Sequence, residues 1–166
     1  MHGVPERDGA GREVKFALIA VAAVANLVLA DAVVKELAAG LLKAKAAIAV
    51  IPGFFNLAYV ENRGCAWGML QGQVWPLAVF GIAALGFLVW KRKSVFGEGK
   101  AARFSEILLY AGIIGNLIDR ICRGYVIDMC DFYVKSSHFP CFNLADSYIS
   151  IAAGIMILCS FGKRTC

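Results

Sequence analysis

The chain has 166 residues, of which 60% are apolar and only 17% are charged. Soluble domains are nearer half apolar and about a quarter charged, so the composition excludes an ordinary soluble globular domain. The net charge is +5, but the basic residues lie in the polar connections between apolar runs and form no nucleic-acid-binding patch. The sequence therefore predicts a polytopic membrane protein, with residues 1–166 forming a single domain.

Four apolar segments are long enough to be transmembrane helices. We expect these spans at about residues 16–39, 74–90, 104–121 and 142–161. Residues 1–15 are polar and contain no apolar core, which favours an N-terminal tail over a cleaved signal peptide. After the first span, Phe55, Leu57 and Tyr59 recur at a period of two. This pattern predicts a short strand at about residues 54–64 that lies on the membrane surface.

The basic residues predict how the spans are oriented. Three lie in the N-terminal tail, five in the connection 91–103 and two in the C-terminal tail. The positive-inside rule places all three segments in the cytoplasm, so the connections 40–73 and 122–141 face the other side. Within the third span, Ala111 and Gly115 form a pair of small residues four positions apart. This spacing predicts a close contact with a neighbouring helix.

The acidic residues of the spans collect at one level of the predicted membrane. Asp31 and Asp119 lie near the outer ends of their spans, Asp146 lies near the outer start of the last span, and Asp128 lies in an outer connection that we expect to be a loop. Asp31 and Lys35 are spaced i,i+4, which predicts a local ion pair with a structural role. A lone carboxylate is costly in lipid, so Asp146 needs a partner from another element. Two carboxylates that share one proton can activate water, and we expect Asp128 and Asp146 to form that pair.

Four motifs of the chain resemble the bacterial lipoprotein signal peptidase family. They are GNLIDRICRGYVIDMCDF at 115–132, FNLADS at 142–147, DAVVK at 31–35 and VENRGCAWGML at 60–70. The resemblance implies an all-α membrane protein with four transmembrane helices and a small β-rich surface on the outer, periplasmic face. It also implies an aspartic endopeptidase of the bacterial inner membrane, with both termini cytoplasmic. Such an enzyme removes the signal peptide from prolipoproteins by cleaving before a diacylglyceryl-modified cysteine.

The resemblance assigns roles by motif position, with Asp128 and Asp146 as the catalytic pair. It assigns the substrate-binding contacts to Asn62, Arg120 and Asn143, with Asn116 as a supporting residue. The implied chemistry uses no metal and no cofactor. The implied partners are diacylglyceryl-modified prolipoproteins and membrane lipids, with no nucleic acid, and we expect a monomer. Two residues depart from the family pattern, since Met129 replaces a usual Phe and Cys65 replaces a small residue, often Ala. Both are apolar and moderate in size, so these departures concern the shape of the pocket and not the chemistry.

Two other functional classes fit part of the sequence. Intramembrane carboxylates also mark ion paths, so a small membrane transporter or proton channel is the alternative. We expect no ionisable group near the midplane or in the inner half of any span, which argues against a proton path. A structural scaffold would leave the clustering at one level unexplained. The six cysteines form no Cys-x-x-Cys or Cys/His cluster, so we interpret them as small apolar packing residues that the chemistry does not need.

Overall fold

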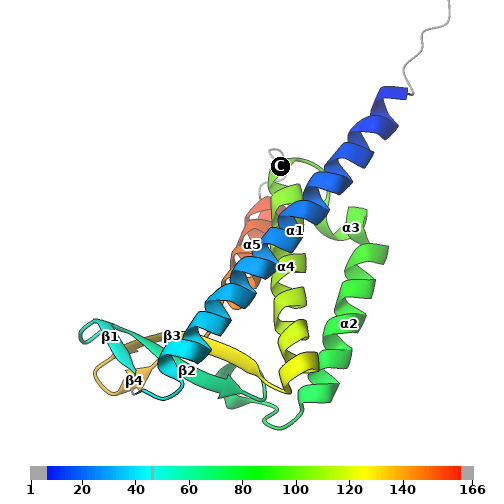
Figure 1. The fold of residues 1–166 in the computed structure, drawn as a ribbon. Coiled ribbons are helices and arrows are strands. Elements are labelled where there is room, and N and C mark those ends of the chain that lie inside the picture. Colours follow the sequence, from blue (N-terminus) through cyan, green and yellow to red (C-terminus); the bar gives the residue numbers. More distant parts are fainter. Residues whose placement is uncertain (1–6, 46, 162–166) are drawn as a thin grey trace, which may run out of the picture.

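The computed structural model describes residues 7–45 and 47–161, which form a bundle of helices with a small antiparallel sheet at one end (Figure 1). The elements are α1 (Arg7–Leu42), β1 (Ile48–Ile51), β2 (Phe55–Asn62), the short 3-10 helix η1 (Ala66–Gly68), α2 (Val74–Trp90), α3 (Arg92–Phe96), α4 (Lys100–Arg123), β3 (Val126–Val134), β4 (Ser137–His138) and α5 (Leu144–Phe161). The first residues of the predicted N-terminal tail, and Lys163, Arg164 and Cys166, lie outside the described residues.

Within the described residues, three helices are long and apolar enough to cross a membrane: α1 from Glu13 to Leu42, α4 and α5. Helix α2 is also apolar but has only 17 residues, and its bounds are those of the predicted span 74–90. The fold is therefore mostly helical, as expected for a multi-pass membrane protein, with a small sheet beside the helices.

The first helix is longer than the predicted span 16–39. It begins at Arg7, within the predicted tail, and it continues through Gly40 to Leu42. A single glycine costs about 1 kcal/mol relative to alanine in a helix, which does not end a helix whose last turns are packed. Ala38 and Leu42 are buried against Ile127 and Met129 of strand β3, and this packing carries the helix past Gly40.

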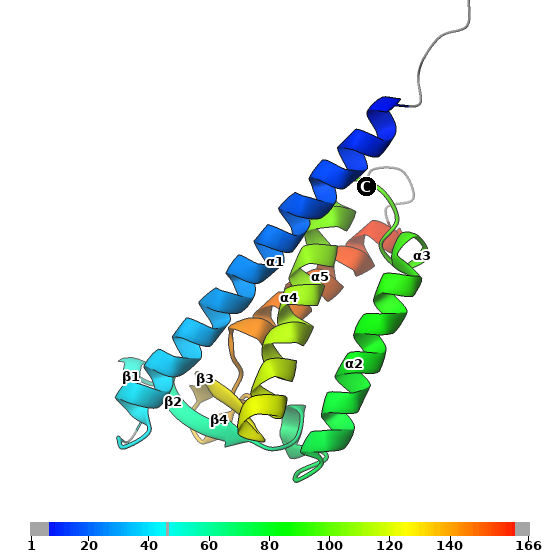
Figure 2. The same cartoon turned by 45° about the vertical axis from the view of Figure 1, so that its right-hand side comes forward.

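Helix α4 is the centre of the bundle and contacts α1, α2 and α5 (Figure 2). The predicted close contact at Ala111 and Gly115 is confirmed, because Ala111 is fully buried and α5 lies directly against this face. A Cβ atom on Gly112 would lie 2.5 Å from the carbonyl oxygen of Ala145. A Cβ atom on Gly115 would lie 2.7 Å from Oδ2 of Asp31. The absence of side chains at these glycines therefore lets α1 and α5 approach α4 closely.

The sheet has the strand order β1-β2-β3-β4 with antiparallel neighbours. Strand β2 confirms the strand predicted at 54–64. Asp128 lies within β3, opposite Val60 of β2, and not in a loop as expected. Strand β3 is contacted by helices α1 and α4 and also by strand β2, so its four residues 126–129 are all buried. This burial is the reason why the prediction of a loop failed. A strand that is covered in this way shows no alternation of apolar and polar residues.

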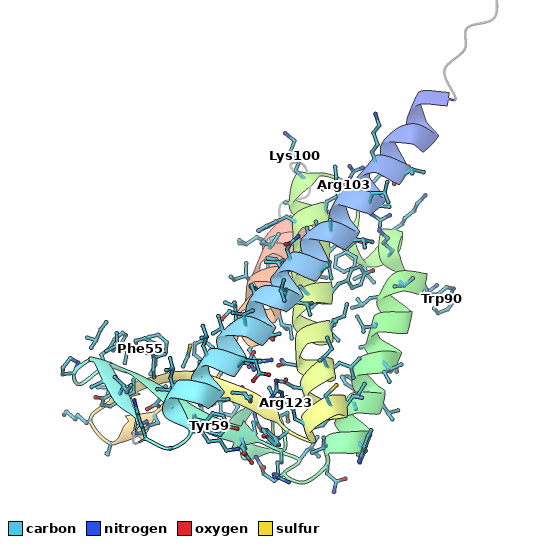
Figure 3. The ribbon with its side chains drawn as sticks, viewed as in Figure 1. Phe55, Tyr59, Trp90, Lys100, Arg103 and Arg123 are labelled. Carbon is cyan, nitrogen blue, oxygen red and sulfur yellow. The ribbon has the colours of Figure 1, made fainter. Side chains whose placement is uncertain are left out.

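The two ends of the bundle differ in charge. We call the end that carries the strands the sheet end, and the opposite end, with Arg92, Lys93, Lys100 and Arg103, the basic end. Figure 3 shows Lys100 and Arg103 at the basic end, far from Phe55, Tyr59 and Arg123. Glu106 is buried near the basic end and forms an ion pair with Arg92. The expectation that the inner half of every span lacks ionisable groups is therefore wrong.

Candidate active site

Asp146 is fixed by the hydrogen bonds that begin helix α5. The backbone N–H of Asp146 donates to Oδ1 of Asn143 over 2.9 Å, and the backbone N–H of Asn143 donates to Oδ2 of Asp146 over 3.2 Å. This reciprocal pair is a capping box, in which the residue before the helix and the third residue of the helix satisfy each other's backbone N–H groups. The carboxylate also lies at the positive end of the helix dipole, where a negative charge is stabilised.

Asp128 approaches the same place from strand β3 and is only 1% exposed. Its Oδ1 accepts a hydrogen bond from Nδ2 of Asn143 over 2.7 Å, and its Oδ2 accepts one from Nδ2 of Asn62 over 2.9 Å. Asn143 therefore joins the two carboxyl groups, because its amide binds Asp128 while its backbone binds Asp146. In the described structure the two carboxyl groups are linked through Asn143, and no hydrogen bond joins them directly.

The surroundings of Asp128 favour its neutral form. Burial, followed by the negative charge of Asp146, raises the pKa of Asp128 to about 7. The amide donors Asn62 and Asn143 act in the opposite direction but do not offset these two effects. Near neutral pH the site can therefore hold one protonated and one ionised carboxyl group, which is the state that general acid–base chemistry needs.

The four predicted substrate-binding residues all lie at this site, but three of them bind the carboxyl groups. Asn62 and Asn143 donate to Asp128, and Asn116 donates through Nδ2 to Oδ1 of Asp146 over 2.7 Å. Arg120 instead donates through Nη2 to the carbonyl oxygen of Gly64 over 3.1 Å and so holds the segment that follows β2. In this structure the three amides orient the carboxyl groups.

A buried group of ions lies beside the carboxyl pair. The predicted pair of Asp31 and Lys35 is confirmed by a contact of 2.7 Å, and both side chains are 1% exposed. Lys35 also contacts Asp119 over 3.0 Å, and Asp119 accepts a further bond from Arg123 over 2.9 Å. Figure 3 shows side-chain oxygen atoms gathered where α1, α4 and β3 converge, close to the labelled Arg123. The sequence indicated that Asp31 and Asp119 share one level but did not indicate that Lys35 lies between them.

An apolar cleft of about 810 Å³ opens beside the two carboxyl groups. Its walls come from α2, α4 and α5, and its sheet end is closed by the segments that follow β2 and β4. Asp128, Asp146 and Arg120 line it at the sheet end, whereas Phe80 and Ile113 belong to its apolar walls. The cleft is therefore suited to an elongated apolar ligand with a polar group at one end.

The residues that depart from the family pattern lie in different places. Cys65 lines the cleft. Met129 is not among the residues that line it, and its side chain packs in the core against Ala38 and Leu42. Cys65, Cys122, Cys130 and Cys141 are free thiols.

Comparison with known proteins gives a consistent result. A family model described as "Signal peptidase (SPase) II" matches residues 21–162. A lipoprotein signal peptidase of Shewanella loihica is 44% identical over 113 residues, covering 65% of this chain and 66% of the relative. Those of Syntrophotalea carbinolica and Symbiobacterium thermophilum are 37% and 38% identical, covering 81% and 79% of this chain and 86% of each relative.

Two solved structures have the same fold. A bacterial membrane enzyme determined at 2.3 Å resolution superposes with a TM-score of 0.77 at 30% identity, covering 89% of this chain and 90% of that one. A second, at 1.9 Å resolution, gives a TM-score of 0.71 at 31% identity, covering 89% and 94%. Together with the motifs and the carboxyl pair at the end of an apolar cleft, these similarities show that the chain belongs to the signal peptidase II family of lipoprotein signal peptidases.

Proposed function

We propose that this chain is an aspartic endopeptidase that cleaves prolipoproteins before a diacylglyceryl-modified cysteine, with Asp128 and Asp146 as its catalytic residues. The observation that carries the proposal is the environment of Asp128. This carboxyl group is buried beside a second carboxyl group, its hydrogen bonds within the described part of the chain come from two amides, and its pKa is raised to about 7. Such a pair can hold one proton between two carboxyl groups at neutral pH.

The chemistry follows from the unequal surroundings of the two carboxyl groups. Ionised Asp146, at the positive end of α5, accepts a proton from a water molecule as that water attacks the scissile carbonyl carbon. Neutral Asp128 donates its proton to the carbonyl oxygen, which becomes the hydroxyl of a tetrahedral intermediate. The intermediate then collapses as Asp128 recovers this proton and Asp146 passes its proton to the departing amine. The pair ends with one proton, as it began.

The cleft supports the proposed class of substrate. Its walls from α2, α4 and α5 are apolar, and its polar groups lie at the sheet end with the carboxyl pair. An apolar signal-peptide helix and the acyl chains of a modified cysteine would bury apolar surface along these walls. The scissile bond would then lie beside Asp128 and Asp146.

The proposed topology has four spans, with α2 as the fourth and the sheet end on the periplasmic side of the bacterial inner membrane. The basic end would then face the cytoplasm together with both termini, as the positive-inside rule requires. Single cysteines introduced near Glu98 and near Ser136 test this arrangement. An impermeant thiol reagent applied to intact spheroplasts should label the site near Ser136 and should not label the site near Glu98. The reverse pattern would contradict the topology.

The function is tested by incubating purified protein with a diacylglyceryl-modified prolipoprotein and identifying the products by mass spectrometry. We expect cleavage before the modified cysteine, much slower cleavage of the unmodified precursor, and a large loss of activity in Asp128→Asn and Asp146→Asn. Asp131→Asn is the matched control, because Asp131 lies on the same strand but binds Asn56 and His138. Full activity in either variant of the pair would refute the proposed catalytic role. An absence of cleavage by the unaltered protein would favour the transporter alternative.

A further inference from the structure

Lys35 does more than form the i,i+4 ion pair that its spacing predicted. Its Nζ contacts three acceptors, namely Oδ2 of Asp31 at 2.7 Å, Oδ2 of Asp119 at 3.0 Å and Oδ1 of Asn116 at 3.2 Å. An ammonium group has three protons to donate, and three acceptors surround this one. A local ion pair would need only Asp31, so the contacts to α4 call for a further explanation.

Two of these acceptors hold backbone groups next to the carboxyl pair. Oδ1 of Asp31 accepts a hydrogen bond from the backbone N–H of Ala145 over 2.9 Å, and Ala145 directly precedes Asp146. Oδ2 of Asp119 accepts one from the backbone N–H of Ile127 over 3.3 Å, and Ile127 directly precedes Asp128. Through its two carboxylate partners, Lys35 therefore connects the start of α5 to strand β3.

The third acceptor connects Lys35 to a carboxyl oxygen itself. The amide of Asn116 accepts through Oδ1 from Lys35 and from Nδ2 of Asn143, and it donates through Nδ2 to Asp146. A flipped amide would place its NH2 group against the Lys35 ammonium and its oxygen against the Asp146 carboxylate. Both contacts would be repulsive, so the charge of Lys35 fixes the amide in the orientation that donates to Asp146.

We propose that Lys35 is a positioning residue for the reaction, which sets the orientation of the Asn116 amide and the separation of Asp128 from Asp146. This inference rests on the proposed function of the two carboxyl groups. Lys35 itself touches neither of them and acts through Asn116, Asp31 and Asp119. Its absence would leave the carboxyl pair in place but less well aligned, and a misplacement of about 1 Å can cost about 100-fold in rate.

The charged groups around Lys35 lie on α1, α4, α5 and β3. Asp31 lies on α1, and Asp119, Arg120 and Arg123 lie on α4. Asp146 on α5 and Asp128 on β3 follow beyond Asn116. The Lys35 ammonium lowers the pKa of Asp128, against the larger opposing effects of burial and of the Asp146 charge. Loss of this positive charge should therefore raise the pKa of Asp128 further.

The test compares two variants of Lys35 in the cleavage assay, with the thermal midpoint, kcat, KM and the pH profile measured for each. Lys35→Met/Asp31→Asn removes one charge of each sign, and the amide introduced at position 31 keeps an oxygen for the N–H of Ala145, so no buried carboxylate loses its only cation. Lys35→Arg keeps the charge but changes the geometry of the donors. Arg92→Met is the control, because it breaks another ion pair of a buried carboxylate, that of Glu106 at the basic end of α4.

We expect the double variant to lose about 100-fold in kcat with KM changed less than about twofold, and its alkaline limit to move to higher pH. We expect Lys35→Arg to lose kcat without a shift in that limit, and Arg92→Met to change only the thermal midpoint.

A folded double variant with the kcat and pH profile of the unaltered protein would overturn the inference, as would an unaltered kcat in Lys35→Arg. If neither Lys35 variant folds, Lys35 is an anchor of the fold and the inference also fails. Asp128→Asn and Asp146→Asn in the same assay report separately on the proposed function, since their activity would refute the pair whatever Lys35 does.

Discussion

Helix α4 carries or contacts a buried carboxyl group near each of its ends, and the two groups have opposite surroundings. At the basic end, Glu106 forms an ion pair with Arg92. At the sheet end, Asp128 has no ion-pair partner among the described residues and is bound by the amides of Asn62 and Asn143. Both carboxyl groups are at least nine-tenths buried, so burial alone does not distinguish them.

The difference shows how a membrane protein can use one kind of side chain for two purposes. A carboxylate paired with a guanidinium is held in its ionised form, and the pair joins two segments of the chain. A carboxyl group that is bound by neutral amides beside another carboxylate can exist in either protonation state near neutral pH. The partner, more than the depth of burial, therefore separates the structural carboxyl group from the proposed catalytic one.

The largest expected effect tests whether Asp128 and Asp146 act as a unit. Either single change to asparagine should reduce kcat/KM by about 1000-fold or more, because general acid–base catalysis is lost. The double variant should be only slightly slower than either single variant, since the first change already disables the pair. Adding Arg92→Met to Asp128→Asn should leave the residual rate per folded molecule unchanged. Fully multiplicative losses for Asp128 and Asp146 would contradict a shared mechanism.

The next effect is on stability and belongs to the basic end. Arg92→Met should lower the free energy of unfolding by about 1–3 kcal/mol, because it leaves Glu106 buried without its cation. The effect is smaller than the roughly 3–5 kcal/mol expected when a fully buried pair is broken, since Arg92 is 36% exposed. Thermal melting in detergent, followed by turnover measured per folded molecule, checks this prediction. A loss of turnover with unaltered melting would place the basic end in the reaction.

The activity and the stability that depend on Asp128, at the sheet end, should both change with pH. Because the pKa of Asp128 is raised to about 7, its proton is present below pH 7 and is lost above it. We therefore expect kcat/KM to fall about tenfold per pH unit above pH 7.

The raised pKa of Asp128 also makes the stability of the fold depend on pH. Asp128 stabilises the folded state most at pH below its ordinary pKa of 3.8, and this stabilisation is lost as pH rises through 7. Asp128→Asn should therefore reduce the change in melting temperature between pH 5.5 and pH 8, values chosen at about 1 to 1.5 units on either side of this pKa. An unaltered change in melting temperature would contradict the assignment of the raised pKa.

The smallest effect concerns the thiols in the cleft. Burial, followed by the charge of Asp128, raises the pKa of Cys141 to about 12, so its thiol is protonated and unreactive at neutral pH. Cys65→Ala and Cys141→Ala should each change kcat/KM by less than about threefold, as expected for residues that only line the cleft. A loss comparable to that of Asp128→Asn would reopen a thiol mechanism.

The sequence was most informative where one physical effect dominates. Long apolar runs predicted α2 with its observed bounds and predicted α4 and α5 to within a few residues. Strand β2 was visible because its aromatic residues alternate, whereas β3 was not visible because the four residues at its start are all buried. Patterns of neighbouring residues therefore predicted the helices, which are apolar along their length, and β2, whose residues alternate. They did not predict β3, which is covered by other elements on several sides.

The arrangement of the site depended on contacts between distant residues. Asp128 and Asp146 were identified by resemblance and by their shared level, but the linking role of Asn143 requires the register of β3 against the start of α5. Lys35 and Asn116 are separated by 81 residues, and no local pattern indicates that they touch. Glu106 was overlooked because the predicted third span began only two residues before it, whereas α4 begins at Lys100.

The capping box at the start of α5 ties enzyme assembly to the formation of this helix. The bonds between Asn143 and Asp146 that begin this helix also aim the Asp146 carboxylate, and Asp31 of α1 accepts a hydrogen bond from the N–H of Ala145 in the same first turn. Because α5 follows α1, α4 and β3 in the chain, a polypeptide in which α5 is not yet made or inserted has no second carboxylate in position. Under the proposed function, biogenesis therefore passes through no stage at which an unfinished protease is active in the membrane.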